Sequence, residues 1–283
     1  MPIVLNGTDG ITQADQFNSD STFGFKNRII NGGFTINQRG YVTNTSLTSG
    51  SYGHDRWKGG ASNGTYTFTQ ASAGVNTTIT ITAGSIIQVI EGANLPEGGT
   101  YVLSWTGTAQ GKIGAGSFGA SGITGTITAG TNTNIEFNTG TCGNVQLEVG
   151  STATSFDYRP FGTELALCQR YYEKSYNVDV VPATNTGAGR VFVTALYQSA
   201  GLLDYGGSVP FRVSKRANPT ISYWREDGTS GSWEWATAAG SGNLTAILTN
   251  RVGTTAFSTY ATGSGFTNTP FVISGHWVAS IEL

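Results

Sequence analysis

The sequence predicts an all-β protein in which an N-terminal arm precedes two β domains joined by one short helix. Short stretches of β-branched and aromatic residues alternate with Gly, Asn and Ser, which is typical of β-sandwiches and barrels. Glycine, with 41 of 283 residues, is about twice as common as in an average protein. The 12 Tyr, 14 Phe and 6 Trp can build a core, and the length suits one large or two modest domains.

The first predicted elements are the arm and a half-solvated antiparallel sandwich. Residues 1–27 show neither strand nor helix periodicity, and we interpret them as the arm. Residues 28–160 form the first predicted domain, in which apolar and polar side chains alternate along four segments. Such alternation buries one face of a strand and leaves Thr, Gln or Glu on the other. The four segments are 65–69, 78–82, 101–105 and 144–149.

One short helix is predicted within the connecting segment 161–178. Thr163 is a suitable N-cap, and Glu164 lies in the first turn, where an acidic residue is favoured. Apolar side chains follow at helical spacing, and we expect the helix to end within 175–177. These apolar positions are Leu165, Cys168 and Tyr172.

The remaining residues, 179–283, predict a C-terminal antiparallel β-sandwich. A segment poor in apolar residues, 182–189, predicts a linker or a long loop at its start. Six further stretches rich in β-branched and aromatic residues predict its strands. They are 190–197, 208–213, 220–224, 232–236, 244–248 and 275–283.

Composition and charge argue against several classes of protein. No apolar run approaches the roughly 18–20 residues needed to span a bilayer, and the first residues lack the layout of a secretory signal. A net charge of −2 gives no electrostatic basis for binding nucleic acid. Cys142 and Cys168 are expected to be free, buried thiols, and no Cys or His lies at zinc-ligand spacing. We expect no membrane insertion and no nucleic-acid partner.

Two glycine-rich motifs resemble catalytic signatures but do not fit their surroundings. Residues 60–64 match a nucleophile elbow and residues 114–119 match a dinucleotide fingerprint. Both signatures require a helix directly afterwards, whereas segments rich in Gly and Thr follow here. The segment 54–57 (His-Asp-Arg-Trp) predicts an anchor at a strand end rather than an acid–base group. We therefore expect no enzyme.

Paired carboxylates leave one enzymatic alternative open, because glycoside cleavage needs two of them about 5–9 Å apart. Surface turns are the favoured interpretation of these acidic residues. The candidate pairs are Glu91 with Glu97, and Glu234 with either Glu226 or Asp227.

The clearest indication of function is a group of aromatic residues in the C-terminal domain. Residues 221–224 and 233–235 flank the turn-like run 225–232, which predicts a hairpin with a charged tip. Trp233 and Trp235 then share one face, where flat rings beside carboxylates could stack against a sugar. Burial in the core or between subunits is the alternative, because large aromatics are usually well covered. The candidate carbohydrate-binding residues are Tyr223, Trp224, Asp227, Trp233 and Trp235.

Three groups of motifs carry a resemblance to a known family. They are 27–34 (NRIINGGF), 38–40 (QRG) and 55–57 (DRW); 146–150 (QLEVG), 159–162 (RPFG) and 164–172 (ELALCQRYY); and 209–211 (VPF), 216–220 (RANPT) and 279–283 (ASIEL). In this order they resemble bacteriophage tail fibres, or receptor-binding proteins, and the resemblance covers about 250 residues of the chain. The first domain also resembles jelly-roll carbohydrate-binding modules.

The resemblance implies a virion protein of the tail fibre that is made in the host cytoplasm. It implies a homotrimer whose N-terminal arm attaches to a tail or baseplate protein and whose distal β domain meets the host. Structural calcium is common in the similar modules, but no carboxylate here lies in a motif specific enough to assign as a ligand. We hypothesise that one face of the connecting helix packs near the threefold axis. The trimer-interface residues are Leu165, Cys168 and Tyr172.

These observations together predict a tail fibre that attaches the virion to a host surface polysaccharide or lipopolysaccharide without cleaving it. One alternative is a structural tail or baseplate component whose adhesin is another protein. The other is a glycan-depolymerising tailspike, although such spikes usually devote several hundred residues to a β-helix, and no such repeat is present.

Overall fold

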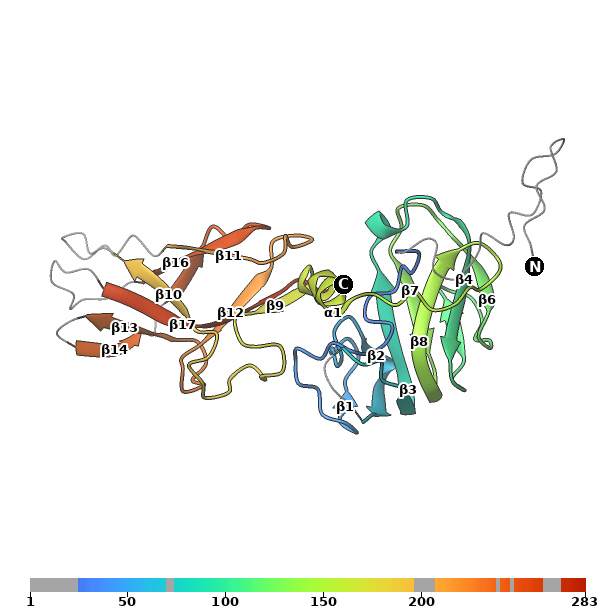
Figure 1. The fold of residues 1–283 in the computed structure, drawn as a ribbon, viewed down its shortest axis with the longest axis horizontal. Coiled ribbons are helices and arrows are strands. Elements are labelled where there is room, and N and C mark those ends of the chain that lie inside the picture. Colours follow the sequence, from blue (N-terminus) through green and yellow to red (C-terminus); the bar gives the residue numbers. More distant parts are fainter. Residues whose placement is uncertain (1–24, 70–73, 196–206, 238–239, 245–246, 262–270) are drawn as a thin grey trace, which may run out of the picture.

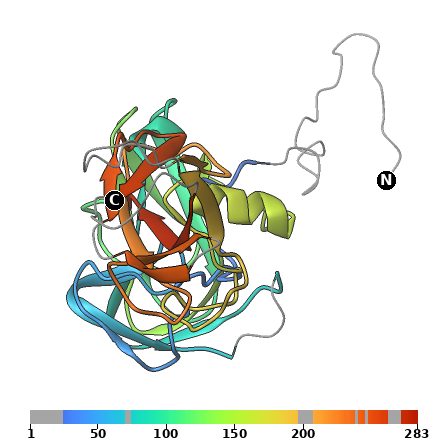
Figure 2. The same cartoon turned by 90° about the vertical axis from the view of Figure 1, so that its left-hand side faces the viewer.

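The computed structural model describes residues 25–69, 74–195, 207–237, 240–244, 247–261 and 271–283. Within these ranges the chain is mostly β, and α1 (Phe161–Gln169) lies between two β lobes (Figure 1). Figure 2, in which the C-terminal lobe faces the viewer, shows α1 on one side of the molecule. Among the described residues, no helix is long and apolar enough to cross a membrane. The predicted all-β fold is confirmed.

The N-terminal lobe is one curled antiparallel sheet. Its order is β1-β2-β3-β8-β4-β6, and β7 pairs with both β3 and β5. The strand β3 pairs with β8 through 79–81 and with β7 through 86–90, so its two halves have different neighbours and the sheet curls. The elements are β1 (Ser46–Leu47), β2 (Lys58–Thr67), β3 (Ile79–Ile90), the 3₁₀ turn η2 (Gly92–Asn94), β4 (Gly99–Thr106), β5 (Gly111–Ile113), β6 (Ile123–Ile127), β7 (Thr133–Phe137) and β8 (Gly140–Val149).

Alternating side chains build the core of this lobe, as the sequence predicts. Along β4, Tyr101, Leu103 and Trp105 all lie in one buried cluster. From β8, Val145 and Leu147 join the same cluster. The opposite face is not left to solvent as predicted, because Val102 in β4 and Gln146 and Glu148 in β8 are buried as well.

The helix begins and ends earlier than predicted. Its N-cap is Pro160 rather than Thr163, and it ends at Gln169 rather than within 175–177. The next residues form β9 (Tyr172–Lys174), which pairs with the last strand of the chain. This tertiary pairing supplies backbone hydrogen bonds that compete with further helix, and local spacing does not reveal it.

The C-terminal lobe is organised around one long strand. β17 pairs with β10 and β13 along its first half and with β12 and β9 along its second half, and β14 extends the sheet beyond β13. A second, three-stranded sheet has the order β11-β16-β15. The strands are β10 (Val191–Ala195), β11 (Ser208–Pro210), β12 (Thr220–Trp224), β13 (Trp233–Thr237), β14 (Gly240–Leu244), β15 (Ile247–Asn250), β16 (Ala256–Ala261) and β17 (Phe271–Ser280).

The predicted aromatic hairpin is wrong. β12 and β13 do not pair with each other, because both run antiparallel to β17 and therefore parallel to one another. The run 225–232 is a loop closed by a bridge between Trp224 and Ser230. The ten residues of β17 offer both strands a long-range partner that the local sequence does not reveal.

The boundaries between the parts also differ from those expected. The predicted arm lies outside the described residues except for 25–27, and Asn27 is buried in the N-terminal lobe. The predicted connecting segment 161–178 contains β9, which belongs to the C-terminal lobe. Beyond β17, residues 281–283 return to the N-terminal lobe, where Glu282 and Leu283 make contacts. The two lobes are thus joined by two crossings of the chain.

Candidate functional site

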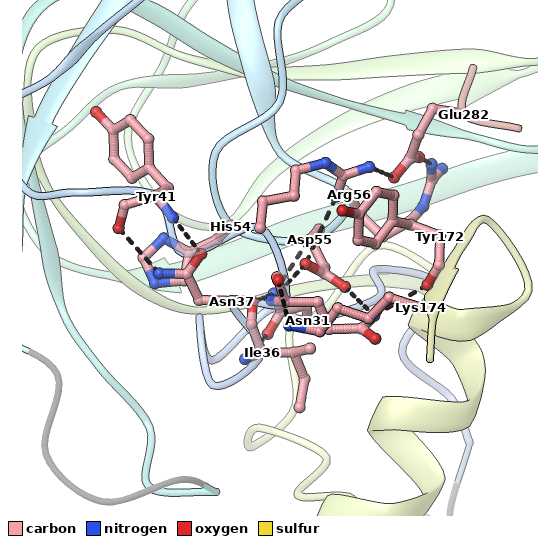
Figure 3. A network of polar contacts seen from close by, with 12 residues as sticks. Asn31, Ile36, Asn37, Tyr41, His54, Asp55, Arg56, Tyr172, Lys174 and Glu282 are labelled. Carbon is pink, nitrogen blue, oxygen red and sulfur yellow. Dashed lines mark hydrogen bonds and ion pairs between the residues drawn. The ribbon is translucent and has the colours of Figure 1, made fainter. Parts of the chain in front are cut away.

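The junction between the lobes contains many of the motif residues. The carboxylate of Glu282 accepts hydrogen bonds from Arg39, at 2.8 Å, and from Arg56 (Figure 3). The Arg39 guanidinium lies 3.7 Å from the ring centre of Tyr172, and that of Arg56 lies 3.6 Å from the ring centre of Tyr171. These close cation–π contacts add to the ion pairs. The junction therefore combines the motifs 38–40, 55–57, 164–172 and 279–283.

Asp55 lies fully buried beside this carboxylate. It accepts hydrogen bonds from the backbone N–H of Gln38, at 3.0 Å, and from the Gln38 side-chain amide, at 2.5 Å. Burial raises the pKa of Asp55 to about 6, against the opposing effect of the positive charge on Arg39. Asp55 is thus held by short contacts in an environment that disfavours its charged form.

Asn31 lies in the motif 27–34 at the start of this lobe, and its contacts show why that position holds an asparagine. Its backbone is left-handed, with φ at 58°, and its side-chain oxygen accepts hydrogen bonds from the backbone N–H groups of Thr35 and Ile36. Its amide donates to the carbonyls of Ile36 and Asp55, while the indole of Trp57 donates to the Asn31 carbonyl at 3.0 Å. Few side chains other than Asn adopt this conformation and supply both donors and acceptors. Segment 54–57 is buried and precedes β2, which confirms its interpretation as an anchor.

The side chain of Lys174 extends from β9 into the junction. Its ammonium donates to the carbonyls of Gln38, at 2.6 Å, of Val178, at 2.9 Å, and of Val180. Burial lowers the pKa of Lys174 to about 8, although the nearby carboxylates of Asp55 and Asp179 oppose this effect. These buried contacts join the two lobes at the junction.

An open groove of about 500 Å³ lies on the C-terminal lobe, and we call it the Phe192 groove. Its volume falls within the usual range of about 300–1,000 Å³ for small-molecule sites. The strands β10, β13, β14 and β17 form it, together with the start of the 225–232 loop. The aromatic and polar side chains that line it are Arg190, Phe192, Arg225, Glu234, Trp235, Ser241, Asn243 and Ser274.

Strand register places a row of these side chains on one face. Phe192 is paired with Ser274, Ser274 with Glu234, and Glu234 with Asn243, so the row crosses four strands. Directly paired residues in neighbouring strands project to the same side of a sheet. The opposite side packs on the core, so this row faces outward. Phe192 is 62% exposed, so its ring is open to solvent on this outer face.

Ion pairs surround the exposed ring. Arg190 donates to Glu234 at 2.8 Å and also to Glu226, while its guanidinium carbon lies 4.7 Å from the ring centre of Phe192. Arg225 pairs with Glu234 at 3.3 Å and with Asp227 at 3.2 Å. Two arginines and three carboxylates therefore form one network at the groove, which holds the charged groups in place around an aromatic surface.

The predicted carbohydrate-binding residues are only partly brought together. Trp233 is fully buried in the core, and its indole N–H donates to the carbonyl of His276 at 2.9 Å. Trp233 therefore cannot stack against a sugar, and the alternative of core packing is correct for it. Trp235 shares its face, as expected, so its half-buried ring packs on the core side of β13 beside Gly242, although Trp235 is also among the residues that border the groove.

The other three predicted residues lie outside the lining of the groove. Tyr223 is half-buried and packs edge-on to Trp233, with ring centres 6.3 Å apart. Trp224 is half-buried beside Tyr176. Asp227 is exposed, and it reaches the groove only through its ion pair with Arg225.

The sequence interpretation missed Phe192 and Arg190, although a signal for both was present. Within the predicted strand 190–197, Arg190, Phe192 and Thr194 alternate with Val191 and Val193. The valines pack on the core, so the other three positions project outward. An aromatic residue among outward-facing polar residues is the pattern that could have identified the groove.

The predicted trimer-interface residues are largely covered by the chain itself. Cys168 is fully buried in a small cluster with Ile30, Ile36 and Tyr171. Tyr172 is 7% exposed and lies against Arg39. The expectation that these two side chains face a threefold axis is therefore wrong, because neither has a surface to offer to another subunit. Leu165 is half-buried against the same cluster.

Cys142 and Cys168 are both buried free thiols, as expected. Burial raises the pKa of each thiol, which leaves them in the unreactive protonated form. In the part of the chain that the structure describes, no group of three or more His, Cys, Asp or Glu residues is placed to hold a metal ion.

Comparison with protein-family models, with curated proteins and with solved structures finds no match to this chain. The function of the chain is therefore inferred from the chemistry of the groove and from the motifs in the sequence.

Proposed function

We propose that this chain is a component of a bacteriophage tail fibre that binds a glycan on the bacterial surface through the Phe192 groove and does not cleave it. The observation that carries the proposal is the 62% exposed ring of Phe192 on the outer face of the C-terminal sheet. A flat ring can stack against the C–H face of a pyranose. The hydroxyl of Ser241 and the amide of Asn243, which are both exposed, can bond sugar hydroxyls.

The pairing of the carboxylates supports binding without cleavage. A glycosidase needs one protonated carboxyl as general acid and a second carboxylate opposite it. In the groove, Glu226 and Glu234 both accept hydrogen bonds from Arg190, and Glu234 also pairs with Arg225. Both carboxylates therefore contact the same guanidinium group, whereas a glycosidase presents its two carboxyl groups to the scissile bond of the ligand.

The virion assignment is supported by the sequence motifs that resemble tail-fibre proteins. Four of those nine motifs, 38–40, 55–57, 164–172 and 279–283, converge on the junction, so these four connect the lobes rather than form the groove. A fibre must hold its distal lobe in a fixed orientation, and a buried junction provides this. In a homotrimer, three copies of a weak site would raise avidity by up to about 10²–10⁴.

Cell binding tests the proposal, with Phe192→Ala as the variant and Phe118→Ala as its matched control. Phe118 is also exposed and lies beside a basic side chain, Lys112, at 4.8 Å, but it belongs to the N-terminal lobe. Labelled protein should bind candidate host cells saturably and lose binding when their surface polysaccharide is extracted. Phe192→Ala should weaken this binding by about tenfold or more, because loss of stacking in each copy is multiplied by avidity.

Each outcome of this experiment decides between proposals. Binding that is lost in Phe118→Ala but kept in Phe192→Ala would place the site on the N-terminal lobe. A protein that has three times the chain mass by light scattering but binds no cells would instead support the structural fibre component. Sustained release of reducing sugar from host polysaccharide would support the depolymerising tailspike.

A further inference from the structure

We infer, on the basis of the proposed function, that the Phe192 groove selects an uncharged saccharide and discriminates against acidic ones. The inference follows from the charges around the groove. Two guanidinium groups, of Arg190 and Arg225, are faced by the three carboxylates of Glu226, Asp227 and Glu234. The network therefore carries one net negative charge, which repels a uronate, a sialate or a phosphate.

The two arginines are already engaged. Arg190 uses one terminal nitrogen for both Glu226 and Glu234, and Arg225 is divided between Glu234 and Asp227. Their side chains are only 19% exposed, so they are held within the network rather than free in solvent. An acidic sugar that bound either arginine would lie close to the carboxylates that already contact it and would be repelled by them.

The rest of the groove offers neutral hydrogen-bonding groups. Among the lining residues that the structure describes, Arg190 and Arg225 are the only basic ones. The hydroxyl of Ser241 and the amide of Asn243, which are both exposed, can donate and accept, as can the hydroxyls of a neutral sugar. The whole chain, with a net charge of −2, gives a polyanion no long-range attraction.

An oligosaccharide array that presents neutral sugars beside their acidic counterparts tests the inference directly. Glucosides printed beside glucuronides and galactosides beside galacturonides differ only at C6, where a hydroxymethyl group replaces a carboxylate. We expect the neutral member of a pair to bind at least about fivefold more tightly. This binding should change little between low and high salt, because no ion pair with the ligand is formed.

A substitution at Glu234 provides the converse test. Glu234→Gln removes the carboxylate that contacts both arginines and leaves the network with no net charge. Acidic members of the array should then gain about fivefold in binding. Glu136→Gln is the matched control, because Glu136 also pairs with a basic residue, Lys112 at 2.8 Å, but lies on the N-terminal lobe. The control should leave the ratio of neutral to acidic binding unchanged.

The outcomes separate this inference from the proposed function. An acidic sugar that binds the unaltered protein more tightly than its neutral counterpart, and loses binding in Arg190→Ala, would overturn the inference and leave the glycan-binding proposal intact. An array on which no sugar binds would overturn the glycan-binding proposal, and the inference with it. Neutral binding that is lost in Phe192→Ala would support both.

Discussion

Glu282 and Arg56 form a buried ion pair although 226 positions separate them in the chain. Arg39 binds the same carboxylate, so one acidic side chain that follows β17 contacts two arginines of the N-terminal lobe. The side chains of Glu282 and Arg56 are only 7% and 1% exposed. Removing one partner of such a pair leaves a charge that is neither solvated nor compensated, which costs far more than a surface pair contributes.

Replacement of Glu282 should therefore destabilise the protein strongly. Glu282→Ala leaves Arg56 buried without its carboxylate, and we expect a loss of about 3 kcal/mol in the free energy of unfolding by urea. The control is Glu97→Ala, because Glu97 also pairs with an arginine, Arg28 at 2.6 Å, but is 46% exposed. That change should cost less than about 1 kcal/mol. Equal losses in the two variants would show that the junction does not hold the lobes together.

Stability should depend on pH through Asp55. Its folded pKa is raised from 3.8 to about 6 by burial, so between about pH 4 and pH 6 the folded state keeps a proton that the unfolded state has lost. Stability from this group is fully present below about pH 4 and falls as pH rises, by at most about 1.4 kcal/mol per pH unit. Urea unfolding at several pH values should show this slope in the unaltered protein.

Asp55→Asn is the variant that isolates the effect, because it removes the titrating group. The difference in unfolding free energy between the unaltered protein and this variant should fall as pH rises from about 4 to about 6. A difference that instead grows with pH would mean that the charge on Arg39 outweighs burial and that the folded pKa of Asp55 lies below that of the unfolded chain.

Much of the fold could be predicted from the sequence because its signals are local. The alternation over 101–105 identifies both β4 and the face that it buries. The same kind of alternation places Trp233 and Trp235 on one face of β13, but it does not say which face a second sheet will cover. That depends on β17, whose first half pairs with β13 from more than thirty positions away. The hairpin prediction failed for the same reason.

The contacts at the junction could not be predicted from local sequence patterns. The motifs 38–40 and 55–57 stand out in the sequence, but nothing near them indicates that Glu282 is their partner. The helix start at Pro160 illustrates a smaller failure, because Thr163 satisfies the rule for an N-cap but lies inside the first turn. Phe192 differs from these cases, since the alternation of 190–194 already places it on the outer face.

Stability should also depend on pH through Lys174. This effect lies in alkaline solution, where stability should rise with pH rather than fall. Burial lowers the pKa of Lys174 from 10.5 to about 8, so between these values the unfolded state binds a proton that the folded state has released. Stability from this group therefore rises with pH over this window. Lys174→Met should reduce the rise, to which Lys58 and Lys215 also contribute because burial lowers their pKa values, whereas Lys112→Met, which removes a lysine of the N-terminal lobe, should keep it in full. A rise of the same size in both variants would show that another group is responsible.

The core of the C-terminal lobe requires a glycine opposite a tryptophan. A Cβ atom at Gly275 would lie 2.2 Å from the Trp233 ring, so Gly275→Ala forces the indole or the strand to move. We expect a cost of about 1–3 kcal/mol from this overpacking, whereas Gly253→Ala, whose Cβ would have an ordinary contact at 3.6 Å, should cost much less.

A double-mutant cycle tests whether the two side chains act on each other. Trp233→Ala alone should cost about 3–5 kcal/mol, because it empties a fully buried site. In that background the added methyl group of Gly275→Ala no longer meets a ring, so its cost should shrink or vanish. The coupling energy should then exceed about 0.5 kcal/mol, the level that distinguishes residues in contact from independent ones. Additive costs would mean that Gly275 is required by the strand backbone and not by the indole packed against it.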